Sequence, residues 1–188
     1  APAEPETVSF TDSLGRTVEL PADITRIAPS GAVATMILAA IAPECMVTIN
    51  AAPSESQMAF LPANLAALPE TGQMYGSKAD LNLETLLAAN PQVVIDLGDK
   101  KGDMTEDLDA LQEQIGIPVV FIEADLAHMA AAFRTLGGLL SGKSDRGEEL
   151  AALVDRTTAI AEENAAKITD DMRVRAMYTT GEDGLGTN

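Results

Sequence analysis

The sequence predicts an α/β fold built around a parallel sheet, and three observations lead to this prediction. Residues 93–95 and 118–122 are short apolar runs rich in β-branched side chains, the pattern of strands buried on both faces of a parallel sheet. Helical patterns alternate with these runs along the chain, as they do in α/β proteins. Hydrophobic residues make up 46% of the 188 residues, which is enough to form a core.

The first half of the chain begins with a β-hairpin signal. Residues 8–10 and 17–20 alternate apolar and polar side chains, and Asp12 and Gly15 between them are placed for a turn. Helix ends are predicted from Pro43, Asn82 as a cap, and Pro91. The further elements expected in this half are a strand at 24–28, a helix at 32–41, a strand at 46–49, a short helix near 57–61 and a helix at 83–89.

The second half contains the two apolar strands and three helices. We expect helices at 107–115 and 128–140, each ended by a glycine. Residues 145–167 form a longer helical pattern with a narrow apolar stripe, which predicts a surface helix roughly 35 Å long. Residues 174–178 have the composition of a new strand.

The charge excludes several classes of function. The formal net charge is −17, so the chain repels nucleic-acid phosphates and anionic membrane surfaces. Only 3% of the residues are aromatic, too few for a stacking site. No run of 18 apolar residues is present, so no membrane span is predicted. The acidic balance itself is interpreted mainly as a source of solubility.

Three loops are placed to form a ligand site. In open α/β sheets, ligands bind outside the carboxyl ends of the strands, and these loops follow strands or lie near that edge. Backbone N–H groups before a helix can face an anion, and a lysine pair supplies a local cation. The candidate ligand-binding residues are Ser30, Gly31, Tyr75, Gly76, Gly98, Asp99, Lys100 and Lys101.

Each of these candidates also has a purely structural interpretation. Ser30 and Gly31 can be a plain helix cap, which is the more common arrangement. The pair of Lys100 and Lys101 can be a solvated loop, and Tyr75 can be a packing residue in its glycine-flanked loop.

The sequence carries no enzymatic motif. It has no Ser/His/Asp order, metal-ligand spacing, GxGxxG or Walker motif, so we expect no enzyme, no catalytic or metal-binding residues and no cofactor. The single Cys45 is interpreted as a buried structural thiol, and His128 as a surface or capping residue.

Several segments taken together resemble the class III periplasmic binding proteins, which carry ferric siderophores, haem, cobalamin and some oxyanions. The helix-to-strand signature at 82–95 is the most specific of these segments. The others resemble the family's opening hairpin, its first core strand and loop, and a later helix-to-strand junction, at residues 10–21, 26–30 and 115–119.

The resemblance implies two Rossmann-like α/β lobes joined by one long helix, with the ligand between them. It assigns residues 1–7 to a flexible leader, 8–143 to the N-terminal lobe and 144–168 to the connecting helix. Residues 172–188 would open a second lobe, most of which is missing. The leader is expected to follow a signal peptide or lipid anchor, or to be an artificial boundary.

The function that the resemblance implies is that of an extracytoplasmic, monomeric solute-binding component of an ABC importer, carrying a metal complex to the permease. Alternatives are an oxyanion binder for molybdate or tungstate, an interaction module, and an enzyme or metallocentre-assembly protein on the same architecture. Acidic side chains dock such proteins on permease arginines, and Glu55 and Glu70 are the two candidates. The run Ser30 to Val33 lacks the Thr–Glu pair that many members have there, so the usual ligand subclass is not assumed.

Overall fold

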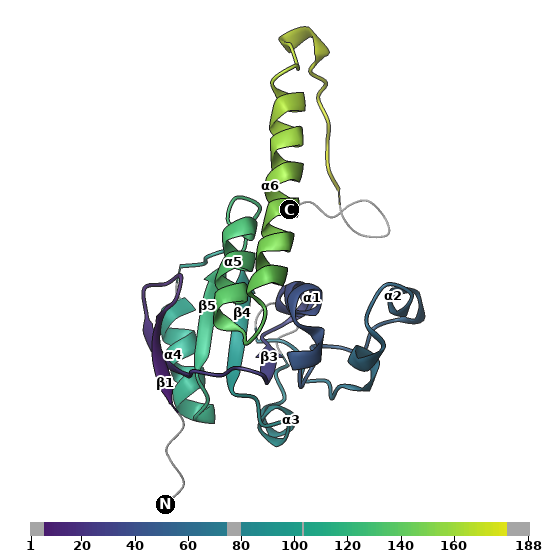
Figure 1. The fold of residues 1–188 in the computed structure, drawn as a ribbon. Coiled ribbons are helices and arrows are strands. Elements are labelled where there is room, and N and C mark those ends of the chain that lie inside the picture. Colours follow the sequence, from purple (N-terminus) through teal and green to yellow (C-terminus); the bar gives the residue numbers. More distant parts are fainter. Residues whose placement is uncertain (1–5, 75–79, 103, 180–188) are drawn as a thin grey trace, which may run out of the picture. The chain divides into compact units, whose positions relative to one another are not determined.

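The computed structural model describes residues 6–74, 80–102 and 104–179. The chain divides into two compact units, Ala1–Val154 and Asp155–Asn188. The first unit carries the sheet and most helices (Figure 1). No helix among the described residues is both long and apolar enough to cross a membrane.

The predicted hairpin is confirmed. Strands β1 (Thr7–Thr11) and β2 (Thr17–Pro21) pair antiparallel. The turn between them is held by Asp12, whose Oδ1 accepts hydrogen bonds from the backbone N–H groups of Leu14 at 2.9 Å and Arg16 at 3.0 Å. Asp12 and Arg16 also form a salt bridge of 2.8 Å with almost no exposure to solvent. Arg16 Nη2 donates to the carbonyl of Val119 at 2.6 Å, which ties the hairpin to the sheet.

The described residues form one parallel sheet, as the sequence predicted, and its strand order is β3-β4-β5 (Figure 1). Its strands are β3 (Ile27–Pro29), β4 (Val93–Gly98) and β5 (Val119–Glu123). Successive residues of each strand belong to different core clusters, because side chains alternate between the faces of a sheet. Both faces are therefore covered by apolar side chains. Alternate strand residues pack in the cluster of α1 and α5, and the others in the cluster of α3 and α4.

The side chain of Gln92 joins β3 to β4 at the amino edge of the sheet. Its Oε1 accepts from the backbone N–H groups of Thr25 at 2.8 Å and Arg26 at 2.9 Å. Its Nε2 donates to the carbonyl of Asp23 at 2.8 Å. Side-chain hydrogen bonds thus continue the pairing of these strands beyond the three pairs that the ladder itself contains.

The helices agree with the sequence prediction within a few residues at each end. Asn82 caps its helix by accepting a hydrogen bond from Thr85 N–H at 3.0 Å. The helices are α1 (Ala32–Ile41), α2 (Glu55–Met58), α3 (Leu83–Ala88), α4 (Met104–Ile115), α5 (Met129–Leu139) and α6 (Ser144–Ala165), with short 3-10 turns at Pro43–Cys45, Ala63–Ala67 and Asp170–Met172.

The strand predicted at 46–49 is wrong. Met46 forms a single parallel bridge with Ile27, and Ile49 forms another with Glu70. The pairing partner changes between these two bridges, so no two consecutive residues share one neighbouring strand. The segment is buried at Met46, Thr48 and Ile49. A buried segment needs apolar residues whether or not it is a strand, and these residues led to the strand prediction.

Helix α6 begins in the first unit and extends into the second. Gly147, Leu150 and Ala151 are buried, whereas every residue from Asp155 to the end of the helix is exposed. Gly147 approaches Gly137 of α5 closely: a Cβ on Gly147 would lie 2.8 Å from the Gly137 Cα. The border between the two compact units falls inside α6.

In the second unit, the strand predicted at 174–178 is wrong for the described residues. This segment has no strand pairing, and the side chains of Val174 and Met177 are 86% and 81% exposed. A strand needs a neighbour for its backbone hydrogen bonds, and the described part of this unit supplies none.

Candidate functional site

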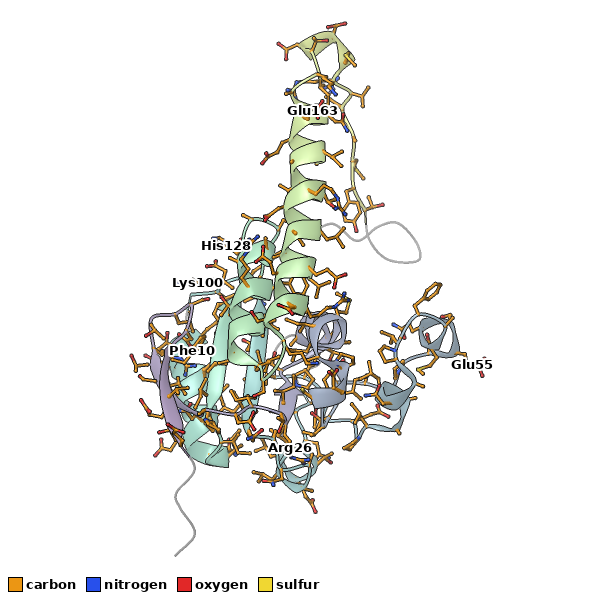
Figure 2. The ribbon with its side chains drawn as sticks, in the orientation of Figure 1. Phe10, Arg26, Glu55, Lys100, His128 and Glu163 are labelled. Carbon is orange, nitrogen blue, oxygen red and sulfur yellow. The ribbon has the colours of Figure 1, made fainter. Side chains whose placement is uncertain are left out.

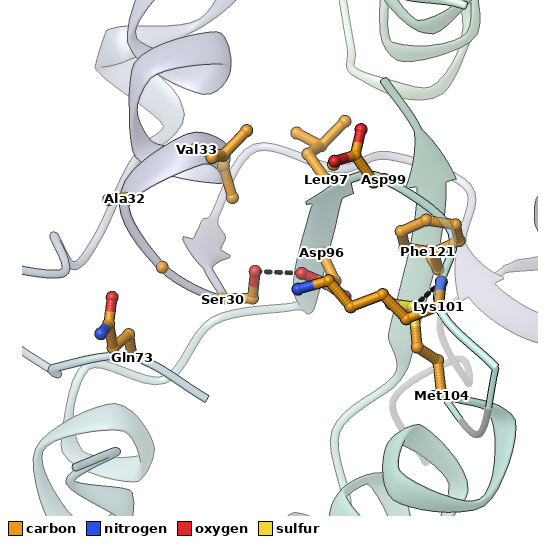
Figure 3. A pocket seen from close by; sticks show the side chains of 13 residues that line it. Ser30, Ala32, Val33, Gln73, Asp96, Leu97, Asp99, Lys101, Met104 and Phe121 are labelled. Atoms are coloured by element: carbon orange, nitrogen blue, oxygen red, sulfur yellow. Dashed lines mark hydrogen bonds between the residues drawn. The ribbon is translucent and has the colours of Figure 1, made fainter. Parts of the chain in front are cut away.

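A pocket of about 220 Å³ lies at the carboxyl edge of the sheet (Figure 3). Parallel strands bring their carboxyl ends to one edge, where the loops that follow them meet. The lining comes from the junction of β3 and α1, from the end of β4 and its loop, and from single residues of other segments. The lining residues are Ser30, Gly31, Ala32, Val33, Ala34, Gln73, Asp96, Leu97, Gly98, Asp99, Lys101, Met104 and Phe121.

The structure gathers five of the predicted residues around this pocket: Ser30, Gly31, Gly98, Asp99 and Lys101. Ligand binding by these residues remains a prediction. Tyr75 and Gly76 lie outside the described residues.

Ser30 and Gly31 form the turn from β3 into α1. Ser30 is 4% exposed, and its N–H donates to the carbonyl of Ile95 at 3.2 Å. Its hydroxyl donates to Asp96 Oδ1 rather than capping the helix. Gly31 is the N-cap residue and provides no side-chain hydrogen bond, and the first turn of α1 has no acidic residue. The first amides of α1 therefore lack a side-chain acceptor beside the pocket.

Asp96 is a pocket residue that the sequence analysis missed. Its side chain is buried, with 5% of the residue exposed, and Oδ2 has no hydrogen-bond partner among the described residues. Burial raises the pKa of Asp96. The hydrogen bond from Ser30, the N–H of Leu97 and the charges of Lys101 and Arg16 act in the opposite direction. Leaving a buried acceptor without a partner costs about 1–3 kcal/mol.

The two adjacent lysines differ in position. Lys101 lines the pocket, and Figure 3 shows its side chain extending toward Asp96. Lys100 is not part of the lining, and its Nζ donates to the carbonyl of Ser13 at 3.4 Å. Among the described residues, Lys101 has no salt bridge to a carboxylate. Of the two lysines predicted at this edge, Lys101 is the one that lines the pocket.

Gln73 is held against the pocket by its neighbours. The N–H of Met74 donates to the carbonyl of Ser30 at 2.9 Å, and the N–H of Gln73 donates to Asp80 Oδ1 at 3.1 Å. A Cβ on Gly31 would lie 3.3 Å from the Cβ of Gln73. Glycine at position 31 thus allows this close approach.

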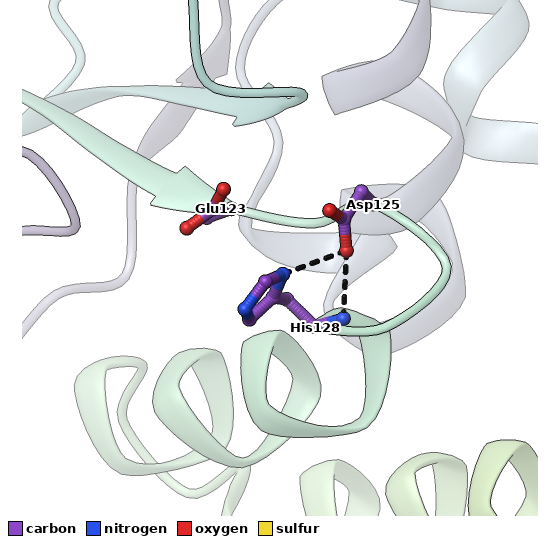
Figure 4. A group of neighbouring side chains, drawn as sticks. All are labelled: Glu123, Asp125 and His128. Carbon is purple, nitrogen blue, oxygen red and sulfur yellow. Dashed lines mark hydrogen bonds and ion pairs between the residues drawn. The ribbon is translucent and has the colours of Figure 1, made fainter.

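A second polar cluster lies just beyond β5 (Figure 4). The cluster contains one potential metal-ligand atom from each of Glu123, Asp125 and His128, and these three atoms lie within 4.8 Å of one another. His128 is the N-cap residue of α5, as the sequence analysis allowed, and its Nδ1 lies 2.7 Å from Asp125 Oδ1. This hydrogen bond raises the pKa of His128. The same hydrogen bond engages Nδ1, one of the two ring nitrogens of His128.

The two candidates for permease docking are both on the surface of the first unit. Glu55 begins α2, and Figure 2 shows its side chain directed away from the body of that unit. Glu70 is exposed beside its bridge with Ile49. The docking role of either residue remains a prediction.

Comparisons with known proteins agree with this architecture. The sequence profile of the family described as periplasmic binding protein matches residues 34–187. An ABC transporter solute binding protein from Sulfurospirillum deleyianum is 25% identical with a TM-score of 0.76, covering 88% of this chain and 51% of that one. No curated protein matches the chain.

Two further solved structures share the fold. The periplasmic heme-binding protein RhuT from Roseiflexus is 25% identical with a TM-score of 0.54, covering 78% of this chain and 52% of that one. The molybdate periplasmic binding protein MolA from Haemophilus influenzae is 19% identical with a TM-score of 0.69, covering 89% and 56%. The chain thus spans about half the length of these structures.

Proposed function

Because this chain belongs to the periplasmic binding protein family, we propose that it is the extracytoplasmic solute-binding component of an ABC importer. In this proposal it binds a metal complex and delivers it to the permease, with no catalytic step. The observation that carries the proposal is the pocket at the carboxyl edge of the sheet, which combines apolar side chains with a few polar and charged ones, at the edge where open α/β sheets bind ligands.

The size of the pocket bears on the ligand class. Pockets that enclose a drug-sized molecule have volumes of about 300–1,000 Å³, whereas this one has about 220 Å³. A ferric siderophore, haem or cobalamin would therefore place only one edge in this pocket. We propose that a second lobe covers the remainder, with α6 as the connection and the domain limits given by the family resemblance.

A free oxyanion such as molybdate is the second candidate ligand. It is small enough for the pocket, and a similar fold is found in a molybdate-binding protein. The uncapped start of α1 and the ammonium group of Lys101 favour negative charge. Both ligand classes present anionic oxygen atoms.

The partner and location follow from the same proposal. A permease would be contacted through Glu55 or Glu70, by analogy with the acidic docking residues of the family. We further propose that the protein acts as a monomer outside the cytoplasmic membrane, held there by a lipid anchor.

The proposal is tested by a thermal-shift screen of the full-length protein against ferric siderophores, haem, cobalamin and molybdate. A ligand that binds only the native state raises the melting temperature, by an amount that grows with its concentration above Kd. We expect one class to do so and the others not. If every ligand left the melting temperature unchanged, the import function would be contradicted and the interaction module favoured.

A further inference from the structure

The buried carboxyl group of Asp96, which lines the pocket, has one oxygen without a hydrogen-bond partner in the described part of the chain. The Ser30 hydroxyl donates a hydrogen bond to Asp96 Oδ1. The other oxygen, Oδ2, is buried and has no partner among the described residues. Leu97, Met104 and Phe121 line the pocket with apolar surface around this group. A buried polar atom is normally paired, and Asp96 lines the pocket, so Oδ2 is suited to a partner from a solute that displaces the side chains now covering it.

We propose that Asp96, held in place by the Ser30 hydroxyl, acts as a protonated acid and donates one hydrogen bond to an anionic oxygen of the solute. The solute therefore binds together with one proton. This inference rests on the proposed function, because it names the chemistry that the same pocket recognises. The anionic oxygen can belong to a free oxyanion or to a carboxylate of a metal chelate.

The charges around Asp96 favour an anionic solute over a cationic one. Lys101 lines the same pocket and places a positive charge on the solute side. The amides at the start of α1 have no side-chain cap and carry the positive end of the helix dipole. Asp99 also lines the pocket, but it is exposed to solvent, which weakens its effect.

The remaining charged neighbours, Arg16 and Asp12, belong to the hairpin turn and are paired with each other. Arg16 acts on Asp96 from the hairpin and is paired with Asp12 at 2.8 Å. Asp12 Oδ2 also accepts from the N–H of Phe121 at 3.3 Å, and Phe121 is the register partner of Asp96. No acidic side chain lies in the first turn of α1.

This binding step takes up one proton from solvent and releases none. In the free protein above its pKa, Asp96 is a carboxylate, and an arriving anion would meet a like charge. Taking up one proton from solvent converts Oδ2 into an O–H donor, and this proton stays on Asp96 while it forms a hydrogen bond with the solute. Burial favours the neutral acid, and the anion favours it further.

Isothermal titration calorimetry on the full-length protein tests this inference. The probes are molybdate, as a free oxyanion, and ferric citrate, as a chelate with carboxylates. Each is titrated between pH 5.5 and 8.5, in two buffers of different ionisation enthalpy, so that proton uptake is measured directly. We expect uptake approaching one proton at the upper pH values, and an affinity that falls by up to about tenfold per pH unit, the limit for one linked proton.

Two variants separate this chemistry from a structural role. Asp96→Asn keeps an acceptor for Ser30 and a permanent N–H donor for the solute. We expect it to bind within a few-fold of the wild type at pH 5.5 and to lose the additional proton uptake. Glu113→Gln makes the same carboxyl-to-amide change at an exposed position of α4 and should keep the wild-type proton uptake. Comparison within one probe cancels the protonation of the probe itself.

The outcomes are distinguishable. Proton uptake with molybdate supports the inference with a free oxyanion, and uptake with ferric citrate supports it with a chelate. Binding with no proton uptake, or with proton release, would overturn the inference and leave the import function standing. An Asp96→Asn protein that retained the full uptake would also overturn it. If neither probe bound but another ligand raised the melting temperature, the anionic chemistry would be wrong while the import function stood.

Discussion

Replacing Gly147 by alanine should destabilise the first unit, because α5 and α6 cross there with no room for a side chain. A Cβ on Gly147 would lie 2.6 Å from the carbonyl oxygen of Phe133 and 2.8 Å from the Cα of Gly137. The first distance is about 0.8 Å short of the 3.4 Å at which ordinary van der Waals contact begins. Both opposing atoms belong to the backbone, so the two helices would have to move apart.

The magnitude follows from two opposing terms. Overpacking of a core usually costs about 1–3 kcal/mol, and a clash with backbone belongs at the upper end. The better helix propensity of alanine returns about 1 kcal/mol. We therefore expect Gly147→Ala to lower the free energy of unfolding by about 2 kcal/mol, which for a chain of this size lowers the melting temperature by about 4–8 °C.

Gly138 provides the matched control. It lies next to Gly137 in α5, and a Cβ at this position would meet nothing within 4 Å. Gly138→Ala should therefore raise the free energy of unfolding by up to about 1 kcal/mol. Urea unfolding followed by circular dichroism measures both variants. A Gly147→Ala protein at least as stable as the wild type would refute the close crossing of these helices.

Three further substitutions test the hairpin and the pocket. Asp12→Ala leaves the buried guanidinium of Arg16 without its main partner and should cost about 3 kcal/mol in urea unfolding; a loss below about 1 kcal/mol would contradict the burial of this pair. Lys101→Ala should weaken binding of an anionic ligand about tenfold or more, whereas Lys100→Ala should change it less than about twofold; equal losses measured by calorimetry would show that the two lysines are equivalent. Burial raises the pKa of Asp96 above its ordinary value of 3.8, so the stability of the wild type relative to Asp96→Asn should fall as the pH rises from about 3.8 through the folded-state pKa and then level off. A constant difference in unfolding free energy from pH 4 to 8 would show that Asp96 has no raised pKa.

The fold was predictable from the sequence where the signal is local. The apolar runs of β4 and β5 and the Asn82 cap of α3 depend on residues a few positions apart, and these elements are confirmed. The segments at 46–49 and 174–178 failed for a different reason. Their composition suits a strand, but a strand also needs a continuous neighbour, and composition does not contain that information.

The pocket was predictable in outline, because a parallel sheet brings the loops after its strands to one edge. Ser30, Gly98 and Lys101 were placed there by that rule. Asp96 was missed because the strand was read only as far as Ile95, although an aspartate inside an otherwise apolar strand was a visible signal. The hydrogen bond from Arg16 to the carbonyl of Val119 joins positions 103 residues apart, and no local sequence pattern predicts such a contact.

The Gln92 hydrogen bonds have a consequence for how this site can change. Ser30 and Asp96 follow directly after the last register pair of β3 and β4, Pro29 with Ile95, so the alignment of the strands already brings them together. Gln92 helps to fix that alignment at the opposite edge, independently of what stands at positions 30 and 96. Substitutions at these two positions can therefore alter which solute is selected while the strands keep their register. In evolutionary terms, such a site can diversify without a new scaffold.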